Sequence, residues 1–175
     1  MLDAFERILV EDGARGATLD ATARAAGVSK GGLLYHFTSK DALESALIER
    51  LRLLVAADIA TIENAPEGAV AHFVRTSVME DDDLDRAIIA TSRLAQNGHS
   101  AATSALREVR ESWEAVLRPH TRDAAALDLV MLVSDGLYFN NALGGDTPLT
   151  VVPTGAALDA LIALVAQVAA PDAAA

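Results

Sequence analysis

The sequence predicts an all-α protein of about nine helices, and three observations support this prediction. About half of the 175 residues are apolar but only 4% are aromatic, so the core must consist of Ala, Leu, Val and Ile. Ala and Leu are strong helix formers. Apolar residues recur at helical spacing along most of the chain, and no stretch alternates apolar and polar residues between hairpin turns.

The first helix is expected from residue 2 to a glycine near residues 13–16, with Phe5 and Leu9 in its apolar stripe. The hydroxyl of Thr18 can accept a free backbone N–H and so cap a second helix, which ends near Ala26. A break between the glycines at 13–16 and Thr18 is therefore expected to separate the first helix from the second.

A second connection follows at once. Gly27 can supply the left-handed backbone conformation that ends a helix, and we expect Val28 to be buried in this hinge. Ser29 is expected to cap a third helix that contains two adjacent glycines, Gly31 and Gly32. Two glycines cost a free helix about 2 kcal/mol relative to alanines, which is tolerable if a close approach to DNA needs bare backbone.

The remaining elements follow from apolar periodicity and from breaks at Gly, Pro and acidic residues. After the third helix ends near residues 35–37, we expect helices at 39–63, 67–79, 83–97, 100–118, 122–143 and 154–169. The run Glu80-Asp81-Asp82-Asp83 is expected to be a solvated helix start and not a metal site, because contiguous carboxylates point in different directions.

Two short helices joined at a glycine form a helix-turn-helix, which places its second helix in the DNA major groove. Lys30 at the start of that helix can donate to guanine O6 and N7. Tyr35 and His36 at its other end can reach phosphate oxygens. Lys40, in the first turn of the next helix, can bind a phosphate together with free backbone N–H groups. The alternative is that Lys40 is solvated, with Asp41 offsetting its charge.

The charge is unevenly distributed. Residues 1–52 carry seven basic and eight acidic residues, whereas residues 53–175 carry seven basic and 17 acidic residues. A DNA-reading head followed by a larger acidic part explains this asymmetry, although acidic surfaces also simply aid solubility.

Residues 2–55 resemble the DNA-binding domain of tetracycline-repressor-like (TetR-type) regulators. The resemblance is carried by Thr18, then AAGVSKG at 25–31, LYHF at 34–37 and SKDAL at 39–43. It implies a DNA-binding domain at 1–45 and an effector-binding and dimerisation domain at 46–175. By position, it implies DNA contacts from Thr18, Ser29, Lys30, Gly31, Leu34, Tyr35, His36 and Lys40.

The same resemblance implies a homodimer that binds a palindromic DNA operator and represses transcription until a small-molecule effector releases it. A transcriptional activator, or a small helical ligand-binding protein with a structural helix-turn-helix, are the alternatives. Thr22 stands where the family usually has a buried Ile, so its hydroxyl needs a partner, for which the carbonyl of Thr18 is available. Leu34 stands where many members have Tyr.

The helices at about 122–143 and 154–169 are apolar over more than one face. By resemblance they form the dimer interface; burial within one subunit is the alternative. Candidate effector-binding residues are polar or aromatic residues within apolar stripes: Arg93, Gln96, Asn97, Trp113, Met131, Asp135, Tyr138 and Asn141. For Trp113 a place in the core competes with a place at the ligand.

Several functional classes lack support in this sequence. With no cysteine, disulfides and thiolate chemistry are excluded, and the four histidines lack metal-ligand spacing. No nucleophile stands beside a base, so we expect no enzymatic activity, no catalytic residue and no cofactor. No apolar run reaches the roughly 18 residues that span a bilayer, and the cytoplasm is the expected compartment.

Overall fold

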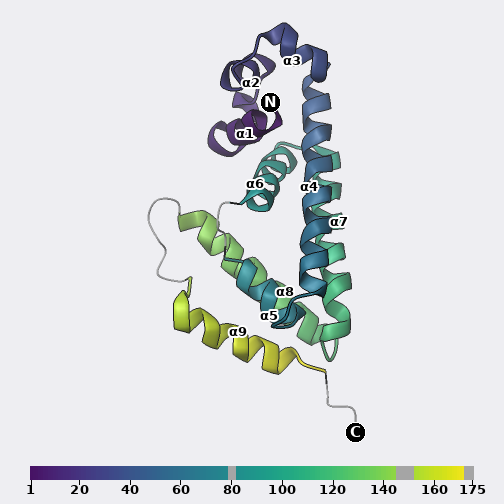
Figure 1. Ribbon diagram of the computed structural model, residues 1–175, viewed down its shortest axis with the longest axis vertical. Coiled ribbons are helices and arrows are strands. Elements are labelled where there is room, and N and C mark those ends of the chain that lie inside the picture. The colour runs from purple at the N-terminus through teal and green to yellow at the C-terminus, as the bar shows by residue number, and fades with distance from the viewer. Residues whose placement is uncertain (79–81, 145–151, 172–175) are drawn as a thin grey trace. The chain divides into compact units, whose positions relative to one another are not determined.

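The computed structural model of the protein describes residues 1–78, 82–144 and 152–171, and within these ranges the chain is helical without strands (Figure 1). The all-α prediction is confirmed. The elements are α1 (Leu2–Gly16), α2 (Leu19–Ala25), α3 (Lys30–His36), α4 (Lys40–Glu63), α5 (Ala69–Thr76), α6 (Asp83–Gln96), α7 (Ser100–Leu117), the 3-10 turn η1 (Arg118–His120), α8 (Ala124–Gly144) and α9 (Gly155–Ala169).

The chain divides into two compact units that do not follow its order. Unit 1 comprises Met1–Ala56 together with Asp81–Val109, and unit 2 comprises Ala57–Glu80 together with Arg110–Ala175. Both α4 and α7 therefore contribute to each unit. The helix α6 belongs to unit 1, with the helix-turn-helix.

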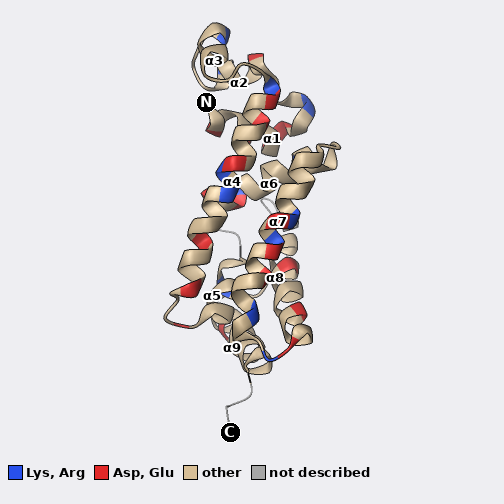
Figure 2. Cartoon of the chain, turned by 90° about the vertical axis from the view of Figure 1, so that its right-hand side faces the viewer, with Lys and Arg blue, Asp and Glu red and all other residues tan. Residues whose placement is uncertain are grey.

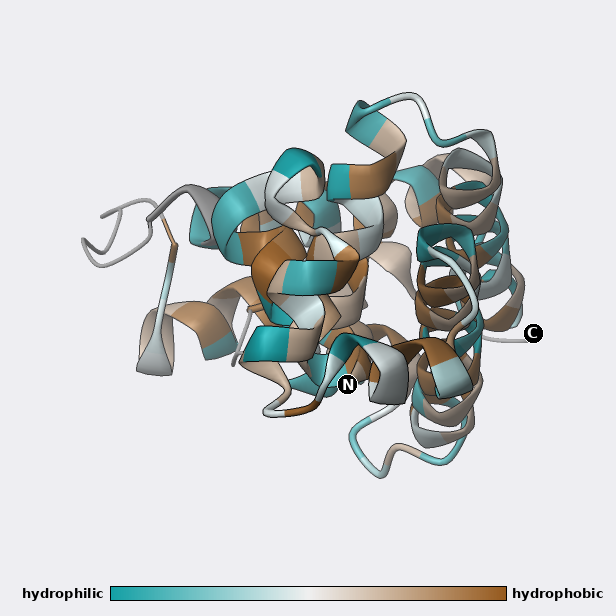
Figure 3. Ribbon diagram, turned by 90° about the horizontal axis from the view of Figure 1, so that it is seen from above, coloured by the Kyte–Doolittle hydropathy of each residue, from teal (hydrophilic) through white to brown (hydrophobic). Residues whose placement is uncertain are grey.

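Unit 1 is built around the apolar stripe of α1. Phe5 and Leu9 are fully buried, and they pack in one cluster with Leu33 of α3, Leu43 of α4 and Leu94 of α6. The helix α1 packs against α2 and α6, and α2 against α3. Hydrophilic and hydrophobic residues alternate along the helices in Figure 3, as they do in amphipathic helices with one buried face.

Unit 2 has its own core, formed mainly by α5, α8 and α9, which pack against one another. Phe73 of α5, Val130 and Met131 of α8, and Val165 of α9 belong to one buried cluster. None of the helices within the described ranges is both long enough and apolar enough to cross a membrane.

Helix boundaries differ from the prediction at a few places. The fifth helix was expected over 67–79 and spans Ala69–Thr76. It begins two residues later than expected because its N-cap Gly68 has a positive φ of 92°, which an α-helix excludes, and it ends at the C-cap Ser77. Glu80 and Asp81 of the acidic run, and the predicted break after Gly144, lie largely outside the described residues. Asp82 accepts the backbone N–H of Asp85 at 2.8 Å and so caps α6, as expected for a helix start.

Candidate nucleic-acid interface

The helix-turn-helix is fixed by side-chain caps at the start of both helices. The Thr18 hydroxyl accepts the N–H of Ala21 at 3.1 Å, and the Ser29 hydroxyl accepts the N–H of Gly32 at 3.0 Å. Both capping predictions are confirmed. The fully buried Thr22 donates its hydroxyl to the Thr18 carbonyl at 2.8 Å, which is the partner that the sequence offered.

The connection between α2 and α3 is closed by backbone hydrogen bonds. Gly27 has φ 68°, its N–H donates to Arg24, and the N–H of Val28 donates to Ala23 at 3.0 Å. This pair of bonds is the Schellman arrangement of a helix C-terminus. The prediction for Gly27 is confirmed, but the burial predicted for Val28 is wrong, since its side chain is 36% exposed. Because backbone bonds close the turn, the valine side chain is free to face outward.

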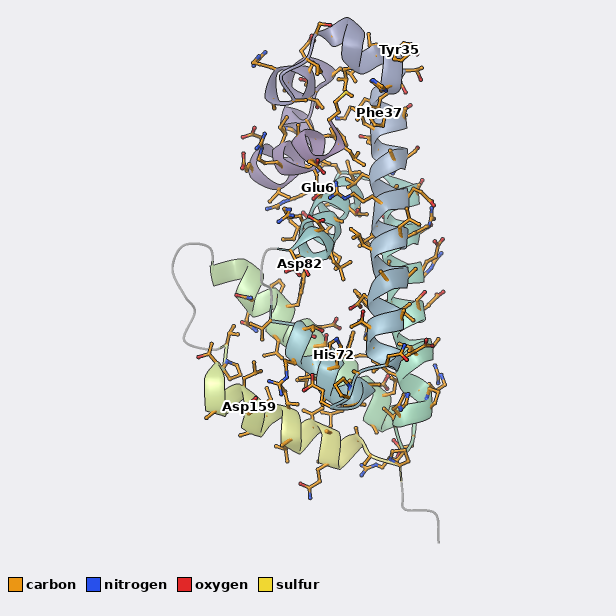
Figure 4. All side chains as sticks on the ribbon, in the orientation of Figure 1. Glu6, Tyr35, Phe37, His72, Asp82 and Asp159 are labelled. Atoms are coloured by element: carbon orange, nitrogen blue, oxygen red, sulfur yellow. The ribbon has the colours of Figure 1, made fainter. Side chains whose placement is uncertain are left out.

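Most residues of the short helix α3 are exposed to solvent. Leu33 is completely buried and Leu34 is half-buried, whereas Lys30, Gly31 and Tyr35 are exposed. Tyr35 is 85% exposed and makes an edge-to-face contact with the exposed ring of His36, at 5.1 Å between centroids. Figure 4 shows Tyr35 on the outside of unit 1. A helix held by one buried leucine, with its polar groups outward, can present those groups to another molecule.

Lys30 has a partner that the sequence reasoning missed. Its ammonium lies 2.9 Å from the carboxylate of Asp20 in the first turn of α2, and both side chains are more than half exposed. The two residues are ten positions apart, so helical spacing gives no signal for this pair. Only the turn at Gly27 brings the first turns of α2 and α3 together.

The sequence predicted that the Lys40 ammonium binds phosphate, but in the structure this ammonium also has partners within the protein. The ammonium donates to the carbonyl of Ala14 at 2.8 Å and lies 3.8 Å from the carboxylate of Glu44. The lysine side chain is 36% exposed. Ser39 caps α4 by accepting the N–H of Ala42 at 3.1 Å. The lysine therefore binds the end of α1 while part of it faces solvent at the start of α4.

The same place in unit 1 holds an open pocket of about 380 Å³. Lys40, Glu44 and His99 line it, together with Asn97 from the end of α6. The Nε2 atom of His99 lies 3.4 Å from the carboxylate of Glu44, while its Nδ1 accepts the N–H of Ala102. The pocket thus lies between the ends of α1 and α6 and the start of α4.

A second charged cluster links α1, α4 and α6 within unit 1. Arg50 of α4 hydrogen-bonds Asp3 and lies 3.5 Å from Glu6 and 3.7 Å from Asp83. Arg86 of α6 lies 3.8 Å from Glu6. Figure 4 shows Glu6 between α1 and α6, and Figure 2 shows acidic and basic residues interspersed along α4.

The two acids of this cluster respond to it in opposite ways. Burial raises the pKa of Glu6, which is only 2% exposed, against the attraction of Arg50 and Arg86. The hydrogen bond from Arg50 lowers the pKa of the exposed Asp3. Arg50 and Arg86 thus attract two acids of different burial, the exposed Asp3 and the buried Glu6.

The predicted effector residues fall into both units. Arg93, Gln96 and Asn97 are exposed at the end of α6 in unit 1, where the Asn97 amide donates to the Arg93 carbonyl at 2.8 Å. Trp113, Met131, Asp135, Tyr138 and Asn141 belong to unit 2. The effector-binding role of the eight residues stays a prediction.

The five residues in unit 2 have different surroundings. Met131 is 2% exposed in the core, and Asp135 is exposed and pairs with Arg110 at 2.7 Å. The indole N–H of Trp113 donates to Asp58 at 2.8 Å, and its ring packs near Phe73. Tyr138 and Asn141 are half-buried. The contacts of Trp113 favour its place beside the core.

A buried hydroxyl pair in unit 2 was also missed. Ser77 donates to the carbonyl of Phe73 at 2.7 Å, and the hydroxyls of Ser77 and Ser134 lie 2.6 Å apart. Because the Ser77 hydrogen is used by Phe73, Ser134 is the donor of the second bond. These two serines are polar groups inside the apolar core of unit 2.

The fold resembles those of solved regulators. A transcriptional regulator from Rhodococcus sp. Rha1 shares 23% identity with a TM-score of 0.65, over 96% of this chain and 95% of that one. The multidrug binding protein EbrR, solved with imidazole, shares 21% identity with a TM-score of 0.62, over 98% and 94%. No curated protein matches the sequence.

Two family descriptions match most of the chain. Residues 1–47 match the bacterial regulatory proteins of the tetR family, which are transcriptional regulators and not enzymes. Residues 67–166 match the tetracyclin repressor-like C-terminal domain. With its exposed recognition helix α3 and both matches in the order of the family, the chain belongs to the TetR family of DNA-binding transcriptional regulators.

Proposed function

We propose that the protein is a homodimeric repressor that binds a palindromic operator and is released by a small-molecule effector. The observation that carries the proposal is α3, whose polar side chains are exposed while Leu33 anchors it and Ser29 caps it. In the proposed division, residues 1–45 bind DNA and residues 46–175 bind the effector and the second subunit. A repressor of this kind works in the cytoplasm, where the operator is.

The proposed DNA contacts follow the order of the exposed groups. Ser29, Lys30 and Gly31, at the start of α3, face base edges, and half-buried Leu34 contacts a thymine methyl. Thr18 at the start of α2 contacts phosphate. Tyr35, His36 and Lys40 hold the phosphate backbone on the other side, as groups that position a recognition helix do.

The proposed dimer interface rests on exposed apolar side chains of α8 and α9. Leu132 and Phe139 of α8 are 64% and 63% exposed, and Leu164 of α9 is 57% exposed. Leu132 and Phe139 are seven residues apart, so they share one face of α8. Monomeric proteins seldom leave such side chains in water over a contiguous patch, whereas dimer interfaces cover them.

Effector binding is the part of the proposal that draws on a relative. The similarly folded EbrR is a multidrug binding protein solved with imidazole. For this chain we propose that a small-molecule effector is bound by predicted residues, and each unit has its own candidates. The candidates in unit 2 are Trp113, Met131, Asp135, Tyr138 and Asn141, and those in unit 1 are Arg93, Gln96 and Asn97. Coupling between effector and operator of about 1–3 kcal/mol is typical of such switches.

Selection of bound duplexes from a random pool, at one stated salt concentration, tests the proposal. The expected result is a palindromic consensus with half-sites about one helical turn apart. A consensus without symmetry would remove the dimer from the proposal. No enrichment of any sequence would leave the helix-turn-helix as a purely structural element.

A further inference from the structure

We propose that Asp20 and Lys30 form one reading unit that recognises a G·C base pair in each half-site. The ammonium of Lys30 donates to guanine O6 and N7, and the carboxylate of Asp20 accepts from the N4 amino group of the paired cytosine. The inference rests on the proposed DNA binding and adds to it a specificity-determining acid that the sequence reasoning did not identify.

The geometry places donor and acceptor side by side on an exposed surface. Asp20 lies in the first turn of α2 and Lys30 is the first residue of α3. Their charged atoms are 2.9 Å apart, and their side chains are 62% and 53% exposed. The caps at Thr18 and Ser29 fix both helix starts, so the pair sits on a rigid backbone at the end of α3 that enters the groove.

Neither ion pairing as a source of stability nor phosphate binding accounts for an acid at this place. Ion pairs between two exposed side chains contribute little to stability. A carboxylate on a surface that approaches DNA is repelled by the phosphates. An acid in the first turn does interact favourably with the dipole of α2. That purely structural role would show as a change in stability and not as a change in base preference.

The edge of a G·C pair matches the unit. In the major groove guanine shows two acceptors, O6 and N7, and cytosine shows one donor, N4. The atoms O6 and N4 are joined by a base-pair hydrogen bond of about 2.9 Å, the usual N–H···O length. A lysine nitrogen and an aspartate oxygen that are also 2.9 Å apart can therefore face them as a closed ring of four hydrogen bonds.

The T·A pair is the closest competitor, because thymine O4 and adenine N6 show the same neighbouring acceptor and donor. However, in a T·A pair the thymine methyl group occupies the position at which guanine N7 would accept a hydrogen bond from the lysine ammonium. The T·A pair also places the acceptor N7 of adenine beside the carboxylate. The unit therefore prefers G·C to T·A.

The variant Asp20→Ala tests the unit, and Asp41→Ala is its matched control. Asp41 is the second residue of α4 after the cap Ser39, just as Asp20 is the second residue of α2 after the cap Thr18. Both changes remove one first-turn carboxylate. Affinities are measured for the selected operator and for versions with each other base pair at the read position, with unfolding followed for both variants.

We expect Asp20→Ala to lose at least about fivefold of the preference for G·C over T·A while binding unrelated duplexes more tightly. Lys30→Ala should lose preference at the same base pair. Asp41→Ala should change all duplexes by one common factor. A purely structural Asp20 would change stability and weaken all duplexes equally, and that result would overturn the proposal.

Two further outcomes distinguish failure of the reading unit from failure of the repressor proposal. If the wild-type protein enriches a palindrome and Asp20→Ala keeps every base preference, the reading unit is wrong and the repressor proposal stands. If the wild-type protein enriches no duplex, DNA reading by this chain is refuted, and the reading unit with it.

Discussion

The ammonium of Lys40 has three N–H donors, and the carbonyl of Ala14 takes one of them. The remaining donors lie near Glu44 and toward solvent, at the capped start of α4. A phosphate at this helix start can therefore bind the lysine without breaking its bond to α1. The residue would then tie α1, α4 and the DNA backbone together.

Replacing Lys40 by Ala should weaken all duplexes about equally and make the log–log salt slope shallower by about one, because one phosphate contact is lost. Titrations of one operator and one unrelated duplex at four salt concentrations measure this. Lys30→Ala is the comparison, since it should weaken the operator by about 1–3 kcal/mol and relax its sequence preference. An unaltered slope for Lys40→Ala would exclude the phosphate contact.

Glu6 is a buried acid of unit 1 whose ionisation changes the stability of the fold. Its pKa is raised above the ordinary 4.5 by burial, so the folded state holds the proton more tightly than the unfolded state. The contribution of Glu6 to stability is therefore full below pH 4.5 and declines as the pH rises through the raised pKa. Asp3 has the opposite sign: its stabilising effect is present above 3.8 and is lost as the pH falls through its lowered pKa.

The variant Glu6→Gln should remove the decline on the alkaline side. Its free energy of unfolding, relative to the wild-type protein, should increase from pH 4.5 upward, because the amide carries no buried charge. Urea unfolding at a series of pH values measures this difference. Asp3→Asn is the control and should diverge from wild type only on the alkaline side of its own lowered pKa. Parallel curves for Glu6→Gln and wild type would contradict the role given to Glu6.

At the scale of the element, α3 combines low intrinsic helix stability with strong local support. Its two glycines favour the unfolded state, whereas the Ser29 cap and the buried Leu33 hold the helix. The two glycines are not equivalent. A Cβ on Gly31 would lie 4.0 Å from its nearest neighbour, but one on Gly32 would lie 3.3 Å from the capping hydroxyl of Ser29.

Gly31→Ala should therefore stabilise the protein by about 0.5–1 kcal/mol and yet weaken operator binding, because the added methyl group stands where the backbone approaches DNA. Gly32→Ala should stabilise less, since it crowds the cap. Urea unfolding and duplex titration of both variants separate the two effects. A Gly31→Ala protein that is more stable and binds the operator normally would remove Gly31 from the interface.

For the whole molecule, α6 packs in a different unit from the one that its place in the sequence indicates. The helix lies within the segment that matches the C-terminal domain of the family, yet it packs in unit 1 against α1. Arg86 and Asp83 of α6 join the charged cluster with Glu6 and Arg50. A change at α6 is therefore felt directly by the helix that supports the helix-turn-helix.

Dimerisation through α8 and α9 can be tested by placing charges on their exposed apolar side chains. Leu132→Glu combined with Leu164→Glu should weaken the dimer at least about tenfold, or ~1.4 kcal/mol, because two charges enter an apolar interface. Sedimentation velocity over a range of concentrations measures it. Leu53→Glu, on the 65% exposed Leu53 of α4, is the control and should leave the dimer intact. The reverse pattern would move the interface from α8 and α9 to α4.

The all-α class, the order of the helices and the local structure of the helix-turn-helix follow from the amino-acid sequence alone. Caps at Thr18 and Ser29, the turn at Gly27 and the bond from Thr22 depend on residues at most five positions apart, so local stereochemistry decides them. The burial of Val28 was predicted wrongly from the local sequence, because its exposure depends on which residues pack over the folded turn.

The contacts between distant residues depend on the three-dimensional fold. It paired Lys30 with Asp20, turned Lys40 onto Ala14, buried Glu6 beside two arginines and moved α6 into unit 1. None of these contacts has a helical period, because each joins different helices through the geometry of turns and packing. Apolar periodicity tells which face of a helix is buried, but the partner of that face is set by the fold as a whole.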